Sequence, residues 1–583
     1  MDKLKKIWPY MAAVISPAVC FWLLESFTYV PFENISINAQ ILNILFYYII
    51  FFILFGLSGN KGIALMLESV IVLAVGLANY YVIQFRSSPI VPWDLLSLKT
   101  ALSVTDNYSF EIPPKVIKII LGFGILFIIG ATAVVKGGKF TKKRILKQAA
   151  FLISGVLMLP AFVKIVSLES VQTWAQLNTT LFTPGIMCRD NGFAVTFMMD
   201  MQYMDIDAPS GYSREEAEEE LKKYQQEDTG EKQLPDIIVI MDECFSDPSV
   251  LGSFNTSPDY MPFIHRLQQG AENTVTGNLH VSVLGGNTPN TEFEFLTGNT
   301  MAFLPSGSVP YQQYINKEIP SMVSWLNGLG YTTNAVHPYY STGWNRDKVY
   351  SYMGFINVYF NNCFDADTEI IRKYISDAAA FDKVLKLHKE QDGPSFTFLV
   401  TMQNHGGFGR SYEGFNPDIK IEGTDSKYPV NYLSLMKITD NALENLINYL
   451  DKSDDDTVVV FFGDHQPYDI IVNPLLGLKG KSCDTLSDEE VPLRYVVPYL
   501  VWANFDIDSA KGEDTSPNYL GAQVLEMCGI PTSDYQNYLL DLKRKVPVIS
   551  TQYTVDNNGG TPDDKLINMY KKVQYYRLFD NND

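Results

Sequence analysis

The sequence predicts two units of different kinds: five transmembrane helices, then an α/β domain with a mostly parallel sheet and helices on both faces. Residues 1–166 are apolar and carry few charges, whereas the rest is acidic and aromatic, with the mixed composition of a globular protein. At 583 residues the chain is too long for one compact domain. Its formal net charge of −20 disfavours nucleic acid as a partner.

Five apolar stretches near the N-terminus are long enough to cross a bilayer as helices, which takes about 20 residues. They are Trp8–Leu24, Ile41–Leu57, Ile63–Ile83, Val116–Val135 and Ala149–Val166. Buried helices of a soluble protein are the alternative, but these stretches are too long and too closely spaced for that. A cleaved signal peptide does not fit the first stretch, because no small-residue cleavage site follows it and more spans come after it.

Basic residues between the predicted spans indicate their orientation, because cytoplasmic loops are enriched in Lys and Arg. They precede the first span, lie between the second and third, and crowd the turn between the fourth and fifth: Lys3, Lys5, Lys6, Lys61, Lys136, Lys139, Lys142, Lys143, Arg144 and Lys147. Five spans place all three regions on one side. We therefore predict a multi-pass protein of the cell membrane with a cytoplasmic N-terminus and an extracellular second unit.

Residues 167–231 are expected to form a connector that contains helices, with Ser213 placed to cap one of them. From residue 232 onward, short apolar runs alternate with amphipathic helical patterns. The predicted strands are Ile237–Met241, Ser395–Met402, Thr457–Phe462 and Val496–Trp502, and the clearest helices are Ile319–Leu329 and Tyr432–Asp451. This alternation predicts a mostly parallel sheet, and ligands bind at the carboxyl ends of the strands in such folds.

Carboxylates and histidines follow three of these strands. After the first strand come Asp242, Glu243 and Ser246, after the second Asn404 and His405, and after the third Gly463, Asp464 and His465. Such a set suits a divalent cation with mixed nitrogen and oxygen ligands. Each residue alone is better explained as a turn or capping residue, but three strand ends together favour a metal site.

Two further segments carry groups suited to a phosphate ester. Arg346 can hold a phosphate through two parallel hydrogen bonds, and Trp344 nearby offers a flat wall. His337 precedes both. Thr288 follows two glycines, which allow the backbone to turn tightly. The six cysteines contain no C-x-x-C spacing, so neither a zinc knuckle nor a thioredoxin-type site is indicated.

Taken in order, these motifs resemble the lipoteichoic acid synthase family of phosphoglycerol transferases, in the sulfatase-like branch of the alkaline phosphatase superfamily. The matching segments are Met241–Asp247, Gly286–Phe293, His337 with Trp344–Asp347, Asn404-His405 and Gly463–His465. The resemblance covers nearly the whole chain. It implies that residues 232–583 form an extracellular sulfatase-like catalytic domain.

The resemblance also implies roles for individual residues. One divalent ion, Mn²⁺ or Mg²⁺, would be bound by Glu243, Thr288, Asp464 and His465, and a glycerophosphate group by His337, Trp344, Arg346 and His405. Thr288 would be the nucleophile, because a cation lowers the pKa of a bound hydroxyl. Thr291 is a rival, but Thr288 occupies the motif position. Pro289 stands where the family has a small hydroxylated residue, which leaves the acceptor open.

The implied function is transfer of glycerol phosphate from phosphatidylglycerol to a glycerol or glycolipid acceptor, as in lipoteichoic acid synthesis. A phosphoethanolamine transferase, a phosphodiesterase and a catalytically idle envelope sensor or scaffold are the alternatives. Sulfate ester hydrolysis is disfavoured, because the sequence contains no C/S-x-P-x-R motif for formylglycine.

Overall fold

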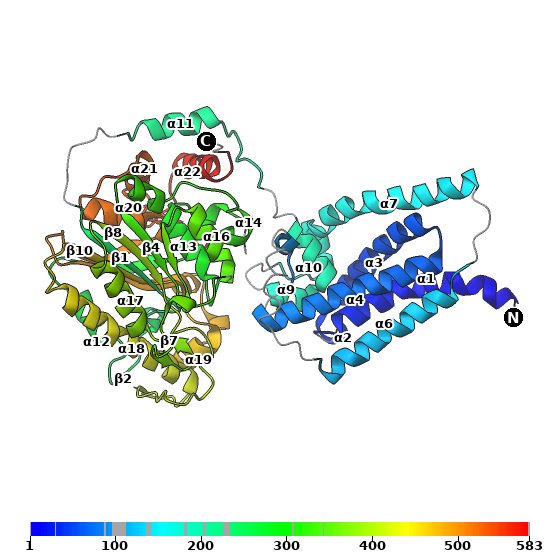
Figure 1. Ribbon diagram of the computed structural model, residues 1–583, viewed down its shortest axis with the longest axis horizontal. Coiled ribbons are helices and arrows are strands. Elements are labelled where there is room, and N and C mark those ends of the chain that lie inside the picture. The colour runs from blue at the N-terminus through cyan, green and yellow to red at the C-terminus, as the bar shows by residue number, and fades with distance from the viewer. Residues whose placement is uncertain are drawn as a thin grey trace. The chain divides into compact units, whose positions relative to one another are not determined.

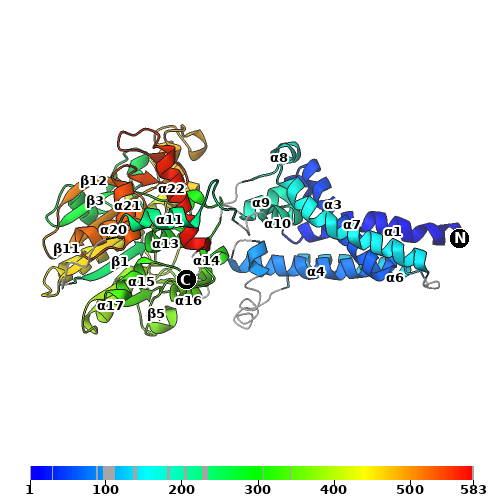
Figure 2. The ribbon, with the colours of Figure 1, turned by 90° about the horizontal axis from the view of Figure 1, so that it is seen from above.

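The computed structural model describes residues 2–28, 31–86, 89–95, 112–135, 141–179, 184–201, 206–225, 234–305, 308–341 and 343–580. Lys136, Lys139 and the end of the predicted connector, 226–231, lie outside them. The chain divides into two compact units, one formed by Met1–Ile206 and the other by Asp207–Pro305 with Val309–Asp583 (Figures 1 and 2).

The first unit is a bundle of helices. The long ones are α1 (Asp2–Glu25), α3 (Ile37–Ser58), α4 (Lys61–Arg86), α6 (Pro114–Thr132) and α7 (Lys142–Val166), and the short ones include α2 (Pro31–Asn34), α8 (Glu169–Ala175), α9 (Pro184–Asn191) and α10 (Phe193–Asp200). Five helices within the described residues are long and apolar enough to cross a membrane. Each of the five predicted spans is therefore confirmed as a candidate membrane helix.

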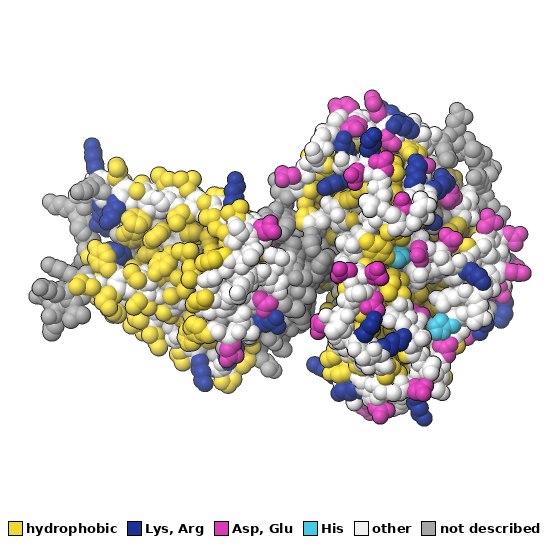
Figure 3. All heavy atoms as spheres, turned by 180° about the vertical axis from the view of Figure 1, so that it is seen from behind, with side chains coloured by type: hydrophobic (Ala, Val, Ile, Leu, Met, Phe, Trp, Pro, Cys, Tyr) yellow, Lys and Arg dark blue, Asp and Glu magenta, His cyan; other side chains and the backbone are white. Residues whose placement is uncertain are grey.

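The face of this helical unit seen in Figure 3 is largely apolar. Leu121 on α6 is 62% exposed, and Leu146 on α7 is 74% exposed. A water-soluble protein seldom presents apolar surface on this scale, whereas lipid chains would cover it at no cost.

The second unit is built on an eight-stranded sheet of order β12-β3-β11-β10-β1-β8-β4-β5. Its strands are β1 (Asp236–Asp242), β3 (Thr274–His280), β4 (Thr332–Val336), β5 (Asn357–Tyr359), β8 (Ser395–Val400), β10 (Thr457–Gly463), β11 (Val496–Ala503) and β12 (Ala510–Thr515). The four predicted strands are β1, β8, β10 and β11. The central strands are parallel, and only β11 pairs antiparallel with its two neighbours, β10 and β3.

Helices cover both faces of this sheet, as Figure 1 shows. Val239 of β1 joins one apolar core with helices α13 (Thr288–Thr297), α15 (Met322–Gly328), α16 (Arg346–Tyr352) and α20 (Pro517–Met527). The next residue, Ile240, joins the opposite core with α12 (Pro262–Gln268), α17 (Asp377–Lys389), α18 (Lys427–Leu450) and α19 (Asp469–Gly477). Both sides of β1 are therefore buried, which explains its continuous apolar run.

The remaining helices pack beside this layered domain. They include α11 (Arg214–Lys222), α14 (Pro310–Gln313), α21 (Asp534–Lys543) and α22 (Asp564–Tyr575). Ser213 caps α11 as predicted, because its hydroxyl accepts the amide of Glu216 at 3.2 Å. Ala217 and Leu221 of α11 share an apolar cluster with Tyr570 of α22.

Candidate active site at the carboxyl edge of the sheet

The carboxyl ends of β1 and β10 bring two loops side by side. Asp242 pairs with Gly463 in the parallel register, so the residues that follow the two strands are neighbours. A Cβ atom on Gly463 would lie 1.8 Å from the backbone oxygen of Phe245, so only glycine permits this approach. Glu243, Asp464 and His465 therefore emerge together at one edge of the sheet.

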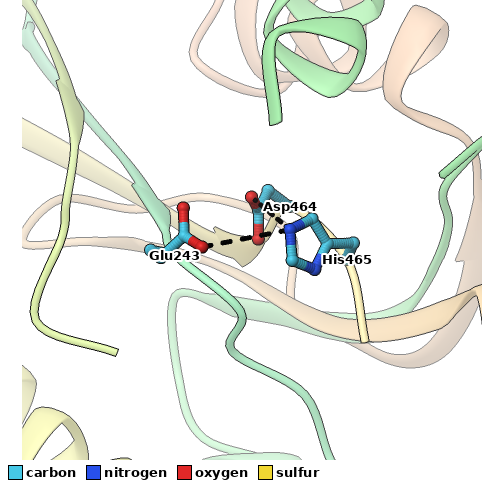
Figure 4. Close-up of side chains that lie close together, drawn as sticks. All are labelled: Glu243, Asp464 and His465. Atoms are coloured by element: carbon cyan, nitrogen blue, oxygen red, sulfur yellow. Dashed lines mark ion pairs between the residues drawn. The ribbon is translucent and has the colours of Figure 1, made fainter. Parts of the chain in front are cut away.

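These three residues form a candidate metal centre (Figure 4). Each offers a ligand atom, and the three atoms all lie within 4.8 Å of one another. His465 Nε2 is 3.2 Å from Asp464 Oδ2 and 4.0 Å from Glu243 Oε1. All three side chains are buried.

The hydrogen bonds around this cluster favour a cation. His465 Nδ1 donates to the backbone oxygen of Gln466 at 3.0 Å, which leaves Nε2 with a lone pair. Asp464 uses Oδ1 to accept the amide of Cys244 at 2.7 Å. Among the described residues, neither His465 Nε2 nor Asp464 Oδ2 has a hydrogen-bond partner. Two buried acceptors thus face each other, and a divalent cation would satisfy both.

The electrostatics of Glu243 agree with this fit. Burial and the charge of Asp464 raise the pKa of the Glu243 carboxyl well above its usual range. Two carboxylates in a buried site repel each other, which raises the pKa, and a bound cation would lower it again. The residues present therefore suit a divalent metal ion with oxygen and nitrogen ligands.

Thr288 lies beside the cluster, at the first residue of α13. Gly285 and Asn287 adopt left-handed backbone angles, φ 68° and 61°, and turn the chain into the helix. The Thr288 hydroxyl donates to Glu243 Oε2 at 3.3 Å. Thr291 instead donates to the backbone oxygen of Asp464 at 2.8 Å, so its hydroxyl is already used in holding that loop. Of the two candidate nucleophiles, Thr288 is the one bonded to a carboxylate of the cluster.

His337 and Arg346 meet at the end of β4. His337 Nδ1 donates to the backbone oxygen of Val400 at 3.0 Å, and its Nε2 accepts Arg346 Nη1 at 3.3 Å. Burial and the charge of Arg346 lower the pKa of His337 well below its usual range, so the ring is neutral. The sequence placed these two residues around a phosphate, and the structure brings them into direct contact.

Glu292 is a partner of Arg346 that sequence reasoning missed. Arg346 Nε donates to its Oε1 at 3.1 Å, and Nη2 donates to the same oxygen. Tyr311 and Tyr350 also donate to Oε2, at 3.2 Å and 2.8 Å. The Nε–Nη2 edge of the guanidinium thus faces a buried carboxylate, and Nη1 faces His337. Nothing in the local sequence distinguished Glu292 from other helix residues.

We expect the Glu292→Gln variant to unfold more easily than the wild type by about 3 kcal/mol, because it leaves the buried Arg346 without its counter-charge. Scanning calorimetry of the full chain in detergent measures this as a lowered Tm. The matched control is Glu526→Gln, because Glu526 pairs with Arg544 at 2.8 Å on the surface, where both side chains are at least half exposed. That control should change the Tm little. Equal shifts in both variants would contradict the buried-pair argument.

Trp344 enters α16 through strained backbone. Trp344 and Asn345 both have left-handed angles, φ 60° and 57°, which cost about 1–3 kcal/mol each in residues other than glycine. Such outliers concentrate at ligand sites. Trp344 is half-buried against the apolar core of this side of the sheet.

A short hairpin holds His405. It is made of β6 (Ile370–Ile371) and β7 (Tyr374–Ile375). The Tyr374 hydroxyl is hydrogen-bonded to His405 Nδ1 at 3.0 Å, and Arg372 Nη2 donates at 2.6 Å to the backbone oxygens of Gln403 and His405. Sequence reasoning missed Arg372 and Tyr374. They belong to the site only because the hairpin folds back onto the loop after β8.

Asn404, which the sequence grouped with His405, has a structural role in this geometry. Its Nδ2 donates to Asp242 Oδ1 at 2.8 Å and to Thr439 Oγ1 at 2.9 Å. Thr401 donates to the other oxygen of Asp242 at 3.0 Å. Asp242 is thereby occupied by hydrogen bonds to the loop after β8.

A mostly parallel sheet with a carboxylate–histidine cluster at its carboxyl edge is the arrangement of the alkaline phosphatase superfamily. The family model described as sulfatase matches residues 235–530, half of the chain. The chain therefore belongs to the sulfatase family. The superfamily expected from the motifs is thus confirmed.

Known proteins resemble the chain to different extents. It is 28% identical over 496 residues to a putative cyclic beta-1,2-glucan modification protein of Rhizobium meliloti, covering 82% of this chain and 74% of the relative. It is 26% identical over 267 residues to a lipoteichoic acid synthase of Staphylococcus saprophyticus, covering 45% of this chain and 40% of the relative.

Among solved structures, the phosphoglycerol transferase GacH of Streptococcus pyogenes, in complex with sn-glycerol-1-phosphate, superposes with a TM-score of 0.52 at 21% identity. The match covers 64% of this chain and 95% of that one. At this identity the likeness shows a shared fold. The roles of the individual site residues stay predictions.

Proposed function

We propose that the protein is a membrane-anchored transferase that takes glycerol phosphate from phosphatidylglycerol and passes it to an alcohol acceptor. The observation that carries this proposal is the Thr288 hydroxyl, bonded at 3.3 Å to Glu243 within the buried cluster of Glu243, Asp464 and His465. The lipoteichoic acid synthase and phosphoglycerol transferase names among the similar proteins support the same class of reaction.

In the first step, Thr288 Oγ attacks the phosphorus of the lipid. A bond forms between this oxygen and phosphorus, and the bond from phosphorus to the diacylglycerol oxygen breaks. The threonine proton leaves through the hydrogen bond to Glu243, and the diacylglycerol oxygen takes up a proton. In the second step an acceptor hydroxyl displaces Thr288 from phosphorus, which restores the free threonine and completes the transfer.

A divalent ion held by Glu243, Asp464 and His465, with Thr288 as a further ligand, would make the hydroxyl more acidic and offset phosphate charge. We propose Mn²⁺, with Mg²⁺ as the alternative. His337, Arg346 and His405 surround the position of the transferred group. Arg346 contributes its positive charge, and the neutral His337 fixes the orientation of Nη1. Trp344 would pack against the glycerol carbons.

The site operates at the outer surface of the membrane in this proposal. The basic residues beside the five candidate spans support a cytoplasmic N-terminus, and an odd number of crossings would then place the chain after them outside the cell. Residues 167–231 then act as the connector to an extracellular catalytic domain formed by 232–583. Phosphatidylglycerol of the outer leaflet supplies the donor.

The relatives differ in what their names say they modify. One is named for lipoteichoic acid, a glycerol-phosphate polymer on a glycolipid, and another for a β-glucan. A glycerol, glycolipid or glucan hydroxyl can each perform the second step, because each offers the same nucleophilic oxygen.

A donor comparison tests the proposal. The purified full chain is incubated with Mn²⁺ and fluorescent phosphatidylglycerol or fluorescent phosphatidylethanolamine, and diacylglycerol release is measured. We expect metal-dependent release from phosphatidylglycerol. Preferential diacylglycerol release from phosphatidylethanolamine would point to a phosphoethanolamine transferase. If the headgroup appears only as free glycerol phosphate, whatever alcohol is added, the protein is a phosphodiesterase. No release from either lipid, together with no bound metal, would favour an idle scaffold and overturn the proposal.

A further inference from the structure

Three tyrosines stand exposed around the candidate active site. Tyr339 is 36% exposed, Tyr340 59% and Tyr468 61%. The first two follow His337 within three residues, and the third follows His465 by three residues. Because these rings are exposed beside the site, their faces are available to a ligand that enters it.

Tyr339 and Tyr340 belong to a continuous wall of rings on the β4 and β8 side of the site. The Tyr339 ring centre is 6.3 Å from that of His337 and 4.7 Å from that of Tyr340. It is also 6.1 Å from the ring of Tyr374, whose hydroxyl meets His405. The wall therefore runs from one predicted glycerophosphate-binding histidine to the other.

Tyr468 forms a second wall on the β10 side. Its ring rests against the backbone that leads to Thr288, because a Cβ atom on Gly285 would lie 2.6 Å from Tyr468 Cδ1. A Cβ atom on Gly286 would lie 3.4 Å from the Tyr468 hydroxyl. The two glycines thus leave room for this ring directly beside the predicted nucleophile, and the rest of the ring stays open to solvent.

The chemistry of these walls suits a sugar ring. A pyranose has a face of C–H bonds whose partial positive charge matches the negative face of an aromatic ring, and its hydroxyls can bond to a phenol. A chain of glycerol phosphates has no such face and carries one negative charge per unit.

We propose that Tyr339, Tyr340 and Tyr468 bind a sugar ring of a neutral glycan, and that a hydroxyl of this glycan is the acceptor. The role of the glycan as acceptor rests on the proposed transferase function, whereas the binding of the glycan does not. The rings hold the sugar between the His337–His405 wall and Tyr468, so that a sugar hydroxyl reaches the phosphorus carried by Thr288.

Calorimetric titration of the full chain in detergent with a β-linked glucose hexasaccharide, without any lipid donor, tests the proposal. We expect Tyr468→Ala and Tyr340→Ala each to raise the Kd about tenfold, because each removes one stacking face. Tyr468→Phe keeps the ring and should bind like the wild type. The control is Tyr449→Ala, because Tyr449 on α18 is 43% exposed and its ring contacts the ammonium of Lys389, 4.5 Å from the ring centre.

The proposal is overturned if the wild type does not bind the hexasaccharide, or if all four variants bind it equally. It is also overturned if a glycerol phosphate hexamer binds more tightly and is lost in the same two alanine variants, because the rings would then serve a polyanion. Since no donor is present, this result is independent of diacylglycerol release. Binding of the hexasaccharide without diacylglycerol release would overturn the transferase function and support the glycan site. Diacylglycerol release without hexasaccharide binding would support the transferase function and overturn the glycan site.

Discussion

The Thr288→Ala variant should lose transfer by at least about a thousandfold while its metal content stays close to that of the wild type. The reason is that Thr288 is the attacking atom in the proposed reaction, whereas Glu243, Asp464 and His465 supply three ligand atoms without it. The measurement is diacylglycerol release from fluorescent phosphatidylglycerol, paired with elemental analysis of the same preparation.

The same variant should also lose a covalent adduct. Mass spectrometry of the wild type after exposure to the lipid should find glycerol phosphate on the peptide that contains Thr288. The matched variant is Thr291→Ala, because the Thr291 hydroxyl only holds the backbone oxygen of Asp464 at 2.8 Å. That variant should keep the adduct. If the adduct persists in Thr288→Ala and disappears in Thr291→Ala, then Thr291 and not Thr288 is the nucleophile.

The second large effect concerns the candidate metal centre. We expect His465→Ala to lower the affinity for Mn²⁺ by about a hundredfold or more, because Nε2 is one of only three donor atoms in the cluster identified within the described residues. Asp464→Asn should act similarly, because the amide removes a negative charge from the ligand set. Metal content after dialysis against a weak chelator, and the Mn²⁺ concentration needed for half-maximal release, measure the effect.

The matched control is Asp508→Asn, which removes an exposed carboxylate away from the cluster. It should retain the metal and the activity of the wild type. If His465→Ala also retains stoichiometric metal, then the lone pairs at His465 Nε2 and Asp464 Oδ2 are not what binds the ion, and the centre must be placed elsewhere.

Much of the fold could be predicted from local patterns. The five apolar stretches appear as helices because length and hydropathy alone decide whether a segment suits a bilayer. The runs in β1, β8 and β10 were recognisable because a strand buried on both faces needs apolar side chains at every position. β3, β4, β5 and β12 were missed: Thr274–His280 contains Gly277 and polar residues, for example, and half of Ala510–Thr515 is charged.

The family resemblance singled out Glu243, Asp464 and His465 as ligands, and a topological rule placed them together, since parallel neighbours end at the same edge. The partners of these residues did not follow from it. Glu292 precedes Arg346 by 54 positions and yet pairs with it in the core, and Tyr374 lies 31 positions before His405. No local pattern signals such contacts, because they depend on how α13, α16 and the β6–β7 hairpin pack.

Local patterns in the sequence were enough to identify the segments that suit the membrane, four of the strands of the sheet, and the residue types that stand at the carboxyl ends of three of them. These properties depend on near neighbours in the chain. Packing in three dimensions pairs Arg346 with Glu292, bonds Thr288 rather than Thr291 to Glu243, and brings Tyr468 beside Gly285, and no local pattern showed these contacts. Those outcomes depend on burial and on hydrogen-bond partners that are far apart along the chain, and a buried polar group must find its partner wherever the fold places one.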